Sequence, residues 1–187
     1  MRIVGGKFKG HSIAPPHGSA TRPTSDRVRE SVFNILAHGI HGLELEGARA
    51  LDLFAGTGAM GLEALSRGAR FCQFVEDSSE ARGLIRKNAD ALGVIGLAKI
   101  WRRDATRLGP CAPQPKFDLV FADPPYGKGL GEQALAALVA GEWLNPGAIV
   151  VLEESEASAI APVDGLTLID ERDYGATTIR FYRQGQS

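Results

Sequence analysis

The stretch "LDLFAGTGAMG", residues 51–61, joins a short apolar run to a helix-forming segment through a glycine-rich turn. Gly56, Gly58 and Gly61 have the G-x-G-x-x-G spacing of nucleotide-binding turns, and Glu76 follows Gly56 by 20 residues. In such a unit the glycines permit a tight turn and close helix–strand packing, while the acid accepts hydrogen bonds from a ribose. The stretch therefore predicts a strand–turn–helix unit that binds a nucleoside.

The rest of the chain alternates between strand and helix patterns, which indicates an α/β fold. Helical spacing first occurs over residues 24–38 and ends before Gly39. The last segment, 166–183, reads as two strands joined near Tyr174 and Gly175. We expect a mostly parallel seven-stranded sheet with an antiparallel C-terminal strand. Its other predicted strands are 48–55, 70–76, 98–105, 117–123 and 148–154, and its other predicted helices are 59–68, 78–93 and 131–143.

Bulk properties are those of an ordinary globular protein. The chain has 187 residues, of which 44% are hydrophobic and 23% charged. No apolar run approaches the ~20 residues of a membrane span, and the N-terminus lacks the apolar centre of a secretory signal. The four histidines and the distant Cys72 and Cys111 have no metal-ligand spacing. We therefore expect a cytoplasmic protein with one main domain, residues 24–187, and with neither a membrane span nor a metal.

An acid lies at the end of three successive predicted strands: Asp52, Glu76 and Asp104. The pyrophosphate of NAD would bring negative charge close to Asp52 in a cleft shielded from water. S-adenosylmethionine is the better partner, because its amine and sulfonium are both positive. Asp104 by itself is as typical of a turn as of an adenine ligand. The three acids together favour S-adenosylmethionine, and an NAD-dependent oxidoreductase is the alternative.

The stretch "FADPPYG", residues 121–127, places an acid, two prolines and a tyrosine directly after an apolar run. Pro124 and Pro125 lack a backbone N–H and fix φ, so strand pairing ends there. The result is either a simple strand-terminating turn or a rigid platform for Asp123 and Tyr126. On such a platform, Asp123 and the Pro124 carbonyl can accept hydrogen bonds from the amine of a base on which Tyr126 stacks.

The first 23 residues are predicted to form a separate basic extension, a hairpin followed by a loop. Residues 1–25 contain four basic side chains and no acid, although the whole chain has a net charge of −1. This asymmetry suggests either a polyanionic partner or a solvated leader. The hairpin turn is formed by Gly5 and Gly6 alone or by a wider loop that reaches Gly10.

Four stretches together resemble the RsmD-type family of 16S ribosomal RNA guanine-N2 methyltransferases. They are "RIVGGKFKG", "RPTSDRVRESVFNIL", "LDLFAGTGAMGLEALSRGA" and "FDLVFADPPY", which occur in this order and cover nearly the whole chain. The resemblance implies a Rossmann-like class I methyltransferase fold with S-adenosylmethionine as methyl donor. It also implies guanine in 16S ribosomal RNA as acceptor, within the small ribosomal subunit. The DPPY motif also occurs in adenine-N6 enzymes, so the motif by itself leaves the base open.

The resemblance assigns a role to each candidate site residue. We expect the protein to be a monomer. Besides an oxidoreductase and an adenine-N6 enzyme, a third alternative function is a nucleic-acid-binding module that has lost activity. The expected catalytic residues are Asp123, Pro124, Pro125 and Tyr126; the cofactor-binding residues are Asp52, Phe54, Gly56, Gly58, Glu76, Asp104 and Ala105; the RNA-binding residues are Arg2, Lys7, Lys9, Arg22 and Thr24.

Overall fold

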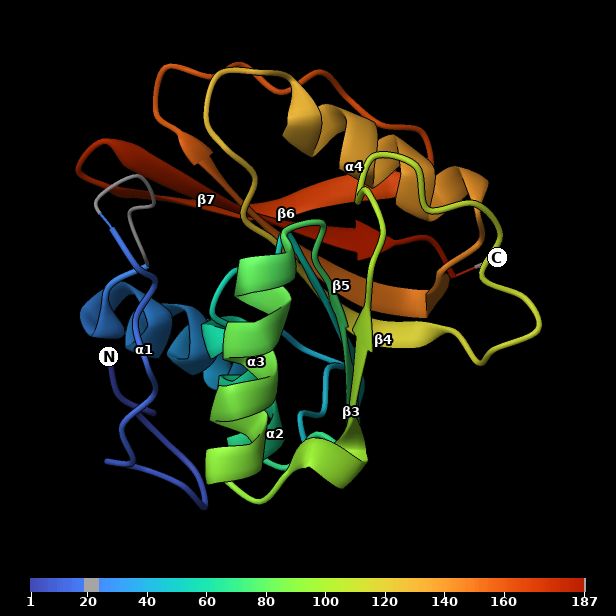
Figure 1. Cartoon of the computed structure of the whole chain (residues 1–187). Helices are drawn as coiled ribbons and strands as arrows, with labels where there is room; N and C mark the ends of the chain where they lie inside the picture. The colour runs from blue at the N-terminus through green and yellow to red at the C-terminus, as the bar shows by residue number, and fades with distance from the viewer. Residues whose placement is uncertain (19–23, 187) are drawn as a thin grey trace.

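A seven-stranded sheet with the order β3-β2-β1-β4-β5-β7-β6 forms the centre of the protein (Figure 1). The computed structural model describes residues 1–18 and 24–186. Its strands are β1 (Arg49–Leu53), β2 (Phe71–Val75), β3 (Ala98–Trp101), β4 (Phe117–Ala122), β5 (Leu144–Ser155), β6 (Leu166–Tyr174) and β7 (Thr177–Gln184). Its helices are α1 (Asp26–Asn34), α2 (Ala59–Ser66), α3 (Ser79–Ala91) and α4 (Leu130–Ala140), with a π-helical turn η1 (Ile35–Gly39) after α1 and a 3-10 turn η2 (Ile95–Leu97) before β3.

The sheet topology confirms the predicted architecture. β1 lies between β2 and β4 and pairs with both in parallel, so the strand order reverses there. β7 inserts antiparallel between β5 and β6. In open sheets of this kind, ligands bind beyond the carboxyl ends of the strands at such a reversal. The ends of β1 and β4 are therefore the place to look for a site.

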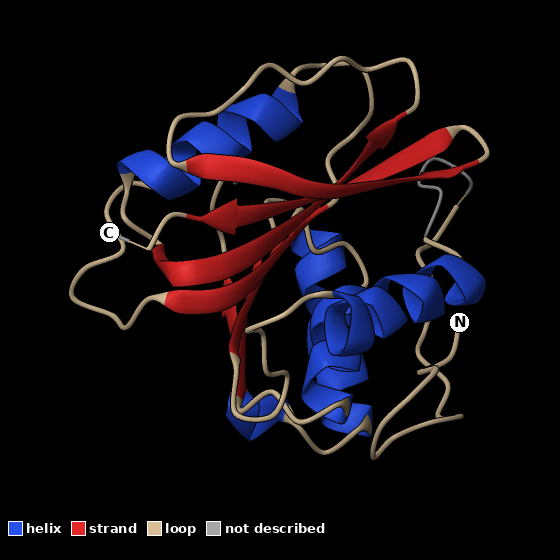
Figure 2. Cartoon of the chain, turned by 180° about the vertical axis from the view of Figure 1, so that it is seen from behind, coloured by secondary structure: helices blue, strands red, loops and turns tan. Residues whose placement is uncertain are grey.

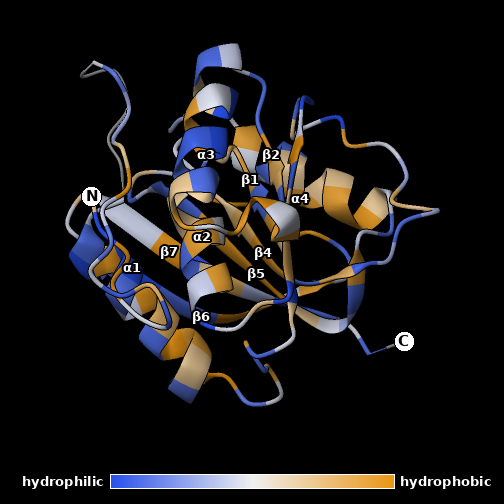
Figure 3. Ribbon diagram, turned by 60° about the horizontal axis from the view of Figure 1, so that its bottom comes forward, coloured by the Kyte–Doolittle hydropathy of each residue, from blue (hydrophilic) through white to orange (hydrophobic). Residues whose placement is uncertain are grey.

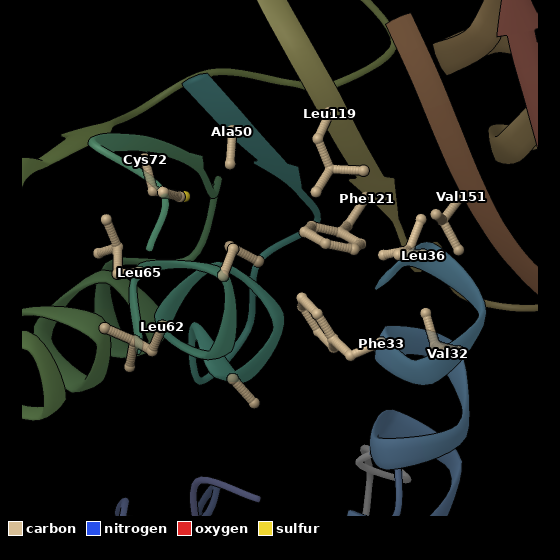
Figure 4. Close-up of a cluster of buried hydrophobic side chains, with 14 of the residues drawn as sticks. Val32, Phe33, Leu36, Ala50, Leu62, Leu65, Cys72, Leu119, Phe121 and Val151 are labelled. Carbon is tan, nitrogen blue, oxygen red and sulfur yellow. The ribbon is translucent and has the colours of Figure 1, made fainter. Parts of the chain in front are cut away.

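Helices cover both faces of the sheet, as expected for strands with apolar residues on both sides. α1, α2 and α3 pack on one face and α4 on the other (Figure 2). Each face of the sheet thus has its own apolar core. Figure 4 shows the core beneath α1 and α2, in which Phe33 of α1 packs on Phe121 of β4 with ring centroids 5.4 Å apart. In Figure 3 apolar residues gather along the inner strands and the helix surfaces that face them, while α3 carries polar residues on its outside.

Three predicted element boundaries are wrong by three or four residues, and packing explains where β3 and α4 end. β3 ends at Trp101 because it pairs only with β2, which itself ends at Val75. α4 ends at Ala140 and not at residue 143. There Trp143 leaves the helix to stack on Phe117, with ring centroids 5.9 Å apart. β5 then begins directly at Leu144, four residues before its predicted start.

The N-terminal segment forms the wider of the two predicted turns. The amide of Ile3 donates to the His11 carbonyl at 3.0 Å, and the Gly10 amide donates to the Ile3 carbonyl at 2.8 Å. A two-residue loop at Gly5 and Gly6 is therefore wrong, and only an isolated bridge between Arg2 and Ser12 is present, not two regular strands. The side chains of Ile3 and Ile13 are buried in the core beneath α1 and α2.

Candidate active site

The glycine turn after β1 has a backbone that only glycine adopts easily. Gly56 and Gly58 have φ values of 55° and 81°, and Phe54 has φ 54°. A left-handed non-glycine residue costs on the order of 1–3 kcal/mol and persists only where its surroundings enforce it. A Cβ at Gly58 would lie 3.2 Å from the Phe74 ring, whereas one at Gly56 would have only the Phe54 carbonyl, 4.0 Å away. The Gly56 side of the turn therefore faces open space.

Glu76, at the end of β2, holds this turn in place. One carboxylate oxygen accepts a hydrogen bond of 2.8 Å from the Gly56 amide, and the other accepts one of 2.9 Å from the Ser78 amide. The acid that the spacing predicts to bind a ribose thus also joins the ends of β1 and β2.

Asp52 lies beneath the turn and is almost fully buried. Its carboxylate accepts a hydrogen bond of 2.9 Å from the Gly61 amide in the first turn of α2. Burial raises the pKa of Asp52 to about 8, the Gly61 amide opposes this shift, and repulsion from Glu76 adds to it. The charge argument against a pyrophosphate therefore holds only after Asp52 has lost its proton.

Asp104 lies three residues beyond the end of β3 and is exposed. Its Oδ1 accepts hydrogen bonds from the Thr106 amide at 2.8 Å and the Thr106 hydroxyl at 2.7 Å. These bonds lower the pKa of Asp104. The local geometry is that of an aspartate turn, followed by the buried Ala105.

The DPPY turn leaves β4 directly beside the glycine turn, because Leu53 of β1 is in register with Ala122 of β4. Pro124 is buried and Pro125 exposed. The Tyr126 residue is 38% exposed. Its hydroxyl nevertheless has two fixed partners, the Glu153 carboxylate and the Thr177 hydroxyl, each at 2.9 Å. One end of the side chain is thus fixed, while its exposed part is available for stacking.

Asp123 belongs to a cluster of acids. The Thr24 hydroxyl lies 2.6 Å from Glu153 Oε2 and 3.4 Å from Asp123 Oδ2, and all three residues line one small pocket. Burial is the main cause that raises the pKa of Asp123 well above its usual range, and repulsion from Glu153, Asp52 and Glu154 adds to it. Asp123 therefore binds a proton more readily than an exposed aspartate does.

Sequence analysis missed Glu153, Glu154 and Thr177 at this site. A signal was present, because the two glutamates directly follow the apolar run of β5, as Asp123 follows that of β4. Thr177 had no such signal, because it enters the site through the pairing of β7 with β5, where it is opposite Ser155.

The sequence matches the family model described as "Conserved hypothetical protein 95" over residues 1–183. It is also 34% identical over 185 residues to "Ribosomal RNA small subunit methyltransferase D" of Haemophilus influenzae, covering 98% of this chain and 93% of the relative. The chain therefore belongs to the family of small-subunit ribosomal RNA methyltransferase D proteins. The resemblance to RsmD-type proteins is thereby confirmed.

Solved structures agree with the assignment to this family. A "putative methyltransferase" from Escherichia coli superposes with a TM-score of 0.84 at 32% identity, over 100% of this chain and 99% of that chain. An RNA methyltransferase from Salinibacter ruber in complex with S-adenosyl-L-homocysteine has a TM-score of 0.63 at 17% identity, over 89% of this chain and 95% of that one. The second likeness concerns the fold alone. The family fold is the Rossmann-like fold of S-adenosylmethionine-dependent methyltransferases.

The predicted RNA-binding residues of this family member fall into two places. Arg2, Lys7 and Lys9 are exposed on the N-terminal segment, whereas Thr24 lies in the acidic cluster beside the DPPY turn. Arg22 lies outside the described residues.

Within residues 1–18 and 24–186, no helix is long and apolar enough to cross a membrane. The same residues contain no group of three or more His, Cys, Asp or Glu that could hold a metal ion.

Proposed function

We propose that this protein transfers a methyl group from S-adenosylmethionine to the exocyclic N2 amine of a guanine in 16S ribosomal RNA. The observation that carries the proposal is the adjacency of the glycine turn and the DPPY turn, at the ends of the paired strands β1 and β4. The name of the Haemophilus relative supports small-subunit ribosomal RNA as the substrate. We further propose that the enzyme acts in the cytoplasm, as a monomer, on RNA within the small subunit.

The residues around the glycine turn fit S-adenosylmethionine. The open side of Gly56 leaves room for a ligand next to the turn. A positive ligand would also relieve the repulsion that Asp52 and Glu76 exert on one another. Bound there, the cofactor supplies an electrophilic methyl group on its sulfonium. The residues proposed to hold it are Asp52, Phe54, Gly56, Gly58, Glu76, Asp104 and Ala105.

The DPPY turn would orient the acceptor amine. An exocyclic amine of a base is a weak nucleophile, because its lone pair is delocalised into the ring. Asp123 and the Pro124 carbonyl accept its N–H hydrogens and favour a pyramidal nitrogen whose lone pair points at the methyl group. Tyr126 stacks on the flipped-out base. When the nitrogen–carbon bond forms and the sulfur–carbon bond breaks, the nitrogen loses a proton, which Asp123 is placed to accept.

The basic N-terminal segment would contact the RNA backbone. Lys7 and Lys9 are exposed, and the backbone at Lys7 is tied to α2 through a 2.7 Å hydrogen bond from the Lys7 amide to the Ser66 carbonyl. Phosphate contacts of this type position an RNA without selecting a base. Base selection would therefore rest with contacts to the base itself and not with the lysines.

The test uses small ribosomal subunits from a strain that lacks the family enzyme, incubated with protein and methyl-labelled S-adenosylmethionine. After digestion to nucleosides, we expect the label in N2-methylguanosine. Label in N6-methyladenosine would establish the adenine alternative. Titration calorimetry that showed binding of NAD but not of S-adenosylmethionine would overturn the proposal and favour an oxidoreductase. Cofactor binding without transfer to any RNA would leave an inactive binding module.

A further inference from the structure

A single side chain, Glu153 near the end of β5, connects two parts of the site. Its Oε1 accepts a hydrogen bond of 2.9 Å from the Tyr126 hydroxyl, and its Oε2 accepts one of 2.6 Å from the Thr24 hydroxyl. The Thr24 hydroxyl is in turn 3.4 Å from Asp123 Oδ2. One oxygen of Glu153 thus contacts Tyr126 directly, and the other contacts the Thr24 hydroxyl, which lies beside Asp123.

The neighbouring Glu154 bonds to backbone amides and not to side-chain hydroxyls. Its buried Oε1 accepts hydrogen bonds from the Gly127 amide at 3.1 Å and the Ser155 amide at 3.0 Å. It therefore fixes the backbone after the DPPY turn and does not contact the Tyr126 hydroxyl. The two adjacent glutamates support the same turn at separate points.

The groups that face Asp123 are almost all acidic. Glu153 and Glu154 come from β5 and Asp52 from β1, and Tyr126 comes from the same turn as Asp123. Within the part of the chain that the structure describes, no Lys, Arg or His forms an ion pair with any of these acids. Within that part of the chain, no ion pair therefore offsets the charge that Glu153 exerts on Asp123.

We propose that Glu153 is a positioning residue of the methyl-transfer site, which holds the Tyr126 ring through the Tyr126 hydroxyl and orients the Thr24 hydroxyl beside the Asp123 carboxyl. The inference rests on the proposed function. β5 is paired with β4 up to Leu152 and with β7 as far as Ser155, so the strand supports this carboxylate from the residue directly before it and through β7. Without it the exposed Tyr126 ring would regain rotational freedom, and each productive encounter with a base would have to restrict that motion again.

The charge of Glu153 should affect how the rate of methyl transfer depends on pH, which a purely structural role would not. Repulsion from Glu153 contributes to the raised pKa of Asp123. Asp123 accepts the amine hydrogens in its ionised form, so the rate should rise with pH as Asp123 loses its proton. Removing the negative charge of Glu153 lowers the pKa of Asp123 and shifts this rise toward lower pH.

Two substitutions separate position from charge. Glu153→Ala removes both hydrogen bonds and should reduce kcat/KM for RNA by about 10- to 100-fold, the usual effect of losing a hydrogen bond to a charged group. Glu153→Gln keeps the shape and can still bond both hydroxyls, so it should recover part of this loss and shift the acid limb of the pH profile downward. Glu156→Gln, a change at an exposed residue on the same segment, is the matched control and should leave rate and profile as in the unaltered protein.

A second measurement does not depend on activity. In protein with carboxyl-¹³C aspartate, the Asp123 signal, assigned through Asp123→Asn, should titrate at lower pH in Glu153→Gln than in the unaltered protein or in Glu156→Gln. If the unaltered protein transfers no methyl group to small-subunit RNA, the proposed function fails, and a shifted titration would still establish the link between Glu153 and Asp123. If Glu153→Gln leaves both the titration and the pH profile in place, the inference is overturned, whether or not Glu153→Ala folds.

Discussion

The Glu63 carboxylate of α2 lies 3.2 Å from Nε of Arg29 in α1, and both side chains are fully buried. The same carboxylate accepts hydrogen bonds from the amides of Val4 at 2.9 Å and Gly5 at 3.0 Å, and it pairs with Arg67 at 3.1 Å. One acid thus joins the basic N-terminal segment to the two helices beneath it. The segment is part of the folded body, so the backbone positions of its lysines are fixed.

Glu63→Gln should therefore destabilise the protein. It leaves the buried Arg29 without its fully buried partner, although Asp26 still pairs with Arg29 at 2.7 Å. Removing one member of a buried pair typically costs about 3–5 kcal/mol, and the Asp26 contact places the expectation near the lower value. Urea unfolding measures this free energy. The control Glu30→Gln, at an exposed site on α1, should change it little, and an equal effect of both changes would contradict the expectation.

The third glycine of the turn motif allows α2 to approach β2. A Cβ at Gly61 would lie 2.4 Å from Phe74 Cε1 and 2.6 Å from Cys72 Sγ. Gly61→Ala should therefore lower the free energy of unfolding by roughly 1–3 kcal/mol, the usual cost of overpacking.

A glycine on the next helix is the matched control for this change. A Cβ at Gly83 in α3 meets no atom within 4 Å, and Gly83→Ala should stabilise by about 0.4–1 kcal/mol through the unfolded chain. Thermal unfolding of both variants under one buffer decides the point. Effects of the same sign would show that close packing is not the reason for glycine at position 61.

Cofactor affinity should depend on pH through Asp52. A positive ligand favours the ionised carboxylate, whose pKa in the free protein is about 8. Binding should therefore weaken as pH falls below about 8 and level off above it. Titration calorimetry with S-adenosylmethionine between pH 6 and pH 9 measures the slope, and Asp52→Asn should bind more weakly and with a flatter profile. The same slope in both proteins would assign the pH dependence to another group.

Asp123→Ala should abolish most transfer and leave S-adenosylmethionine affinity within a few-fold of its original value. Electrostatic and positioning contributions of this kind are worth about 10²–10³ in rate. Single-turnover transfer to small subunits measures the rate, and calorimetry measures the affinity. Near-normal turnover in this variant would remove Asp123 from the mechanism.

The double change Lys7→Ala and Lys9→Ala should weaken subunit binding without affecting cofactor affinity. Each lost phosphate contact reduces the slope of log K against log salt by about 0.7–0.9. Folding should persist, because Ile3 supplies the buried contact of the segment and Lys7 bonds to Ser66 through its backbone.

The control for the lysines is a pair of exposed basic residues outside the N-terminal segment. Arg70 and Lys116 directly precede β2 and β4. Their double alanine variant should keep the salt slope of the unaltered protein. If both pairs gave the same slope, the basic segment would be a solvated leader.

The repeating local pattern of the sequence was enough to predict the fold. Apolar runs alternating with amphipathic helical patterns predicted the sheet and the antiparallel β7. They could do so because the spacing of apolar residues within a segment depends on which of its own residues are buried. The glycine spacing and the DPPY turn identified the ends of β1 and β4, because glycine and proline restrict the backbone wherever they occur. Element ends were less predictable: β3 stops at Trp101 only because its neighbour β2 ends at Val75.

Only the tertiary structure brought together the acids around Asp123. Tyr126 and Glu153 are 27 residues apart, and Thr24 and Glu153 are 129 apart, so no local periodicity relates them. The structure likewise showed that Asp52 bonds to the Gly61 amide and that burial raises its pKa, which the sequence had presented only as a negative charge. The proton affinity of a carboxyl group depends on the water and charges within a few ångströms of it. Those surroundings are set by strand order and register, which arise only when distant segments pack together.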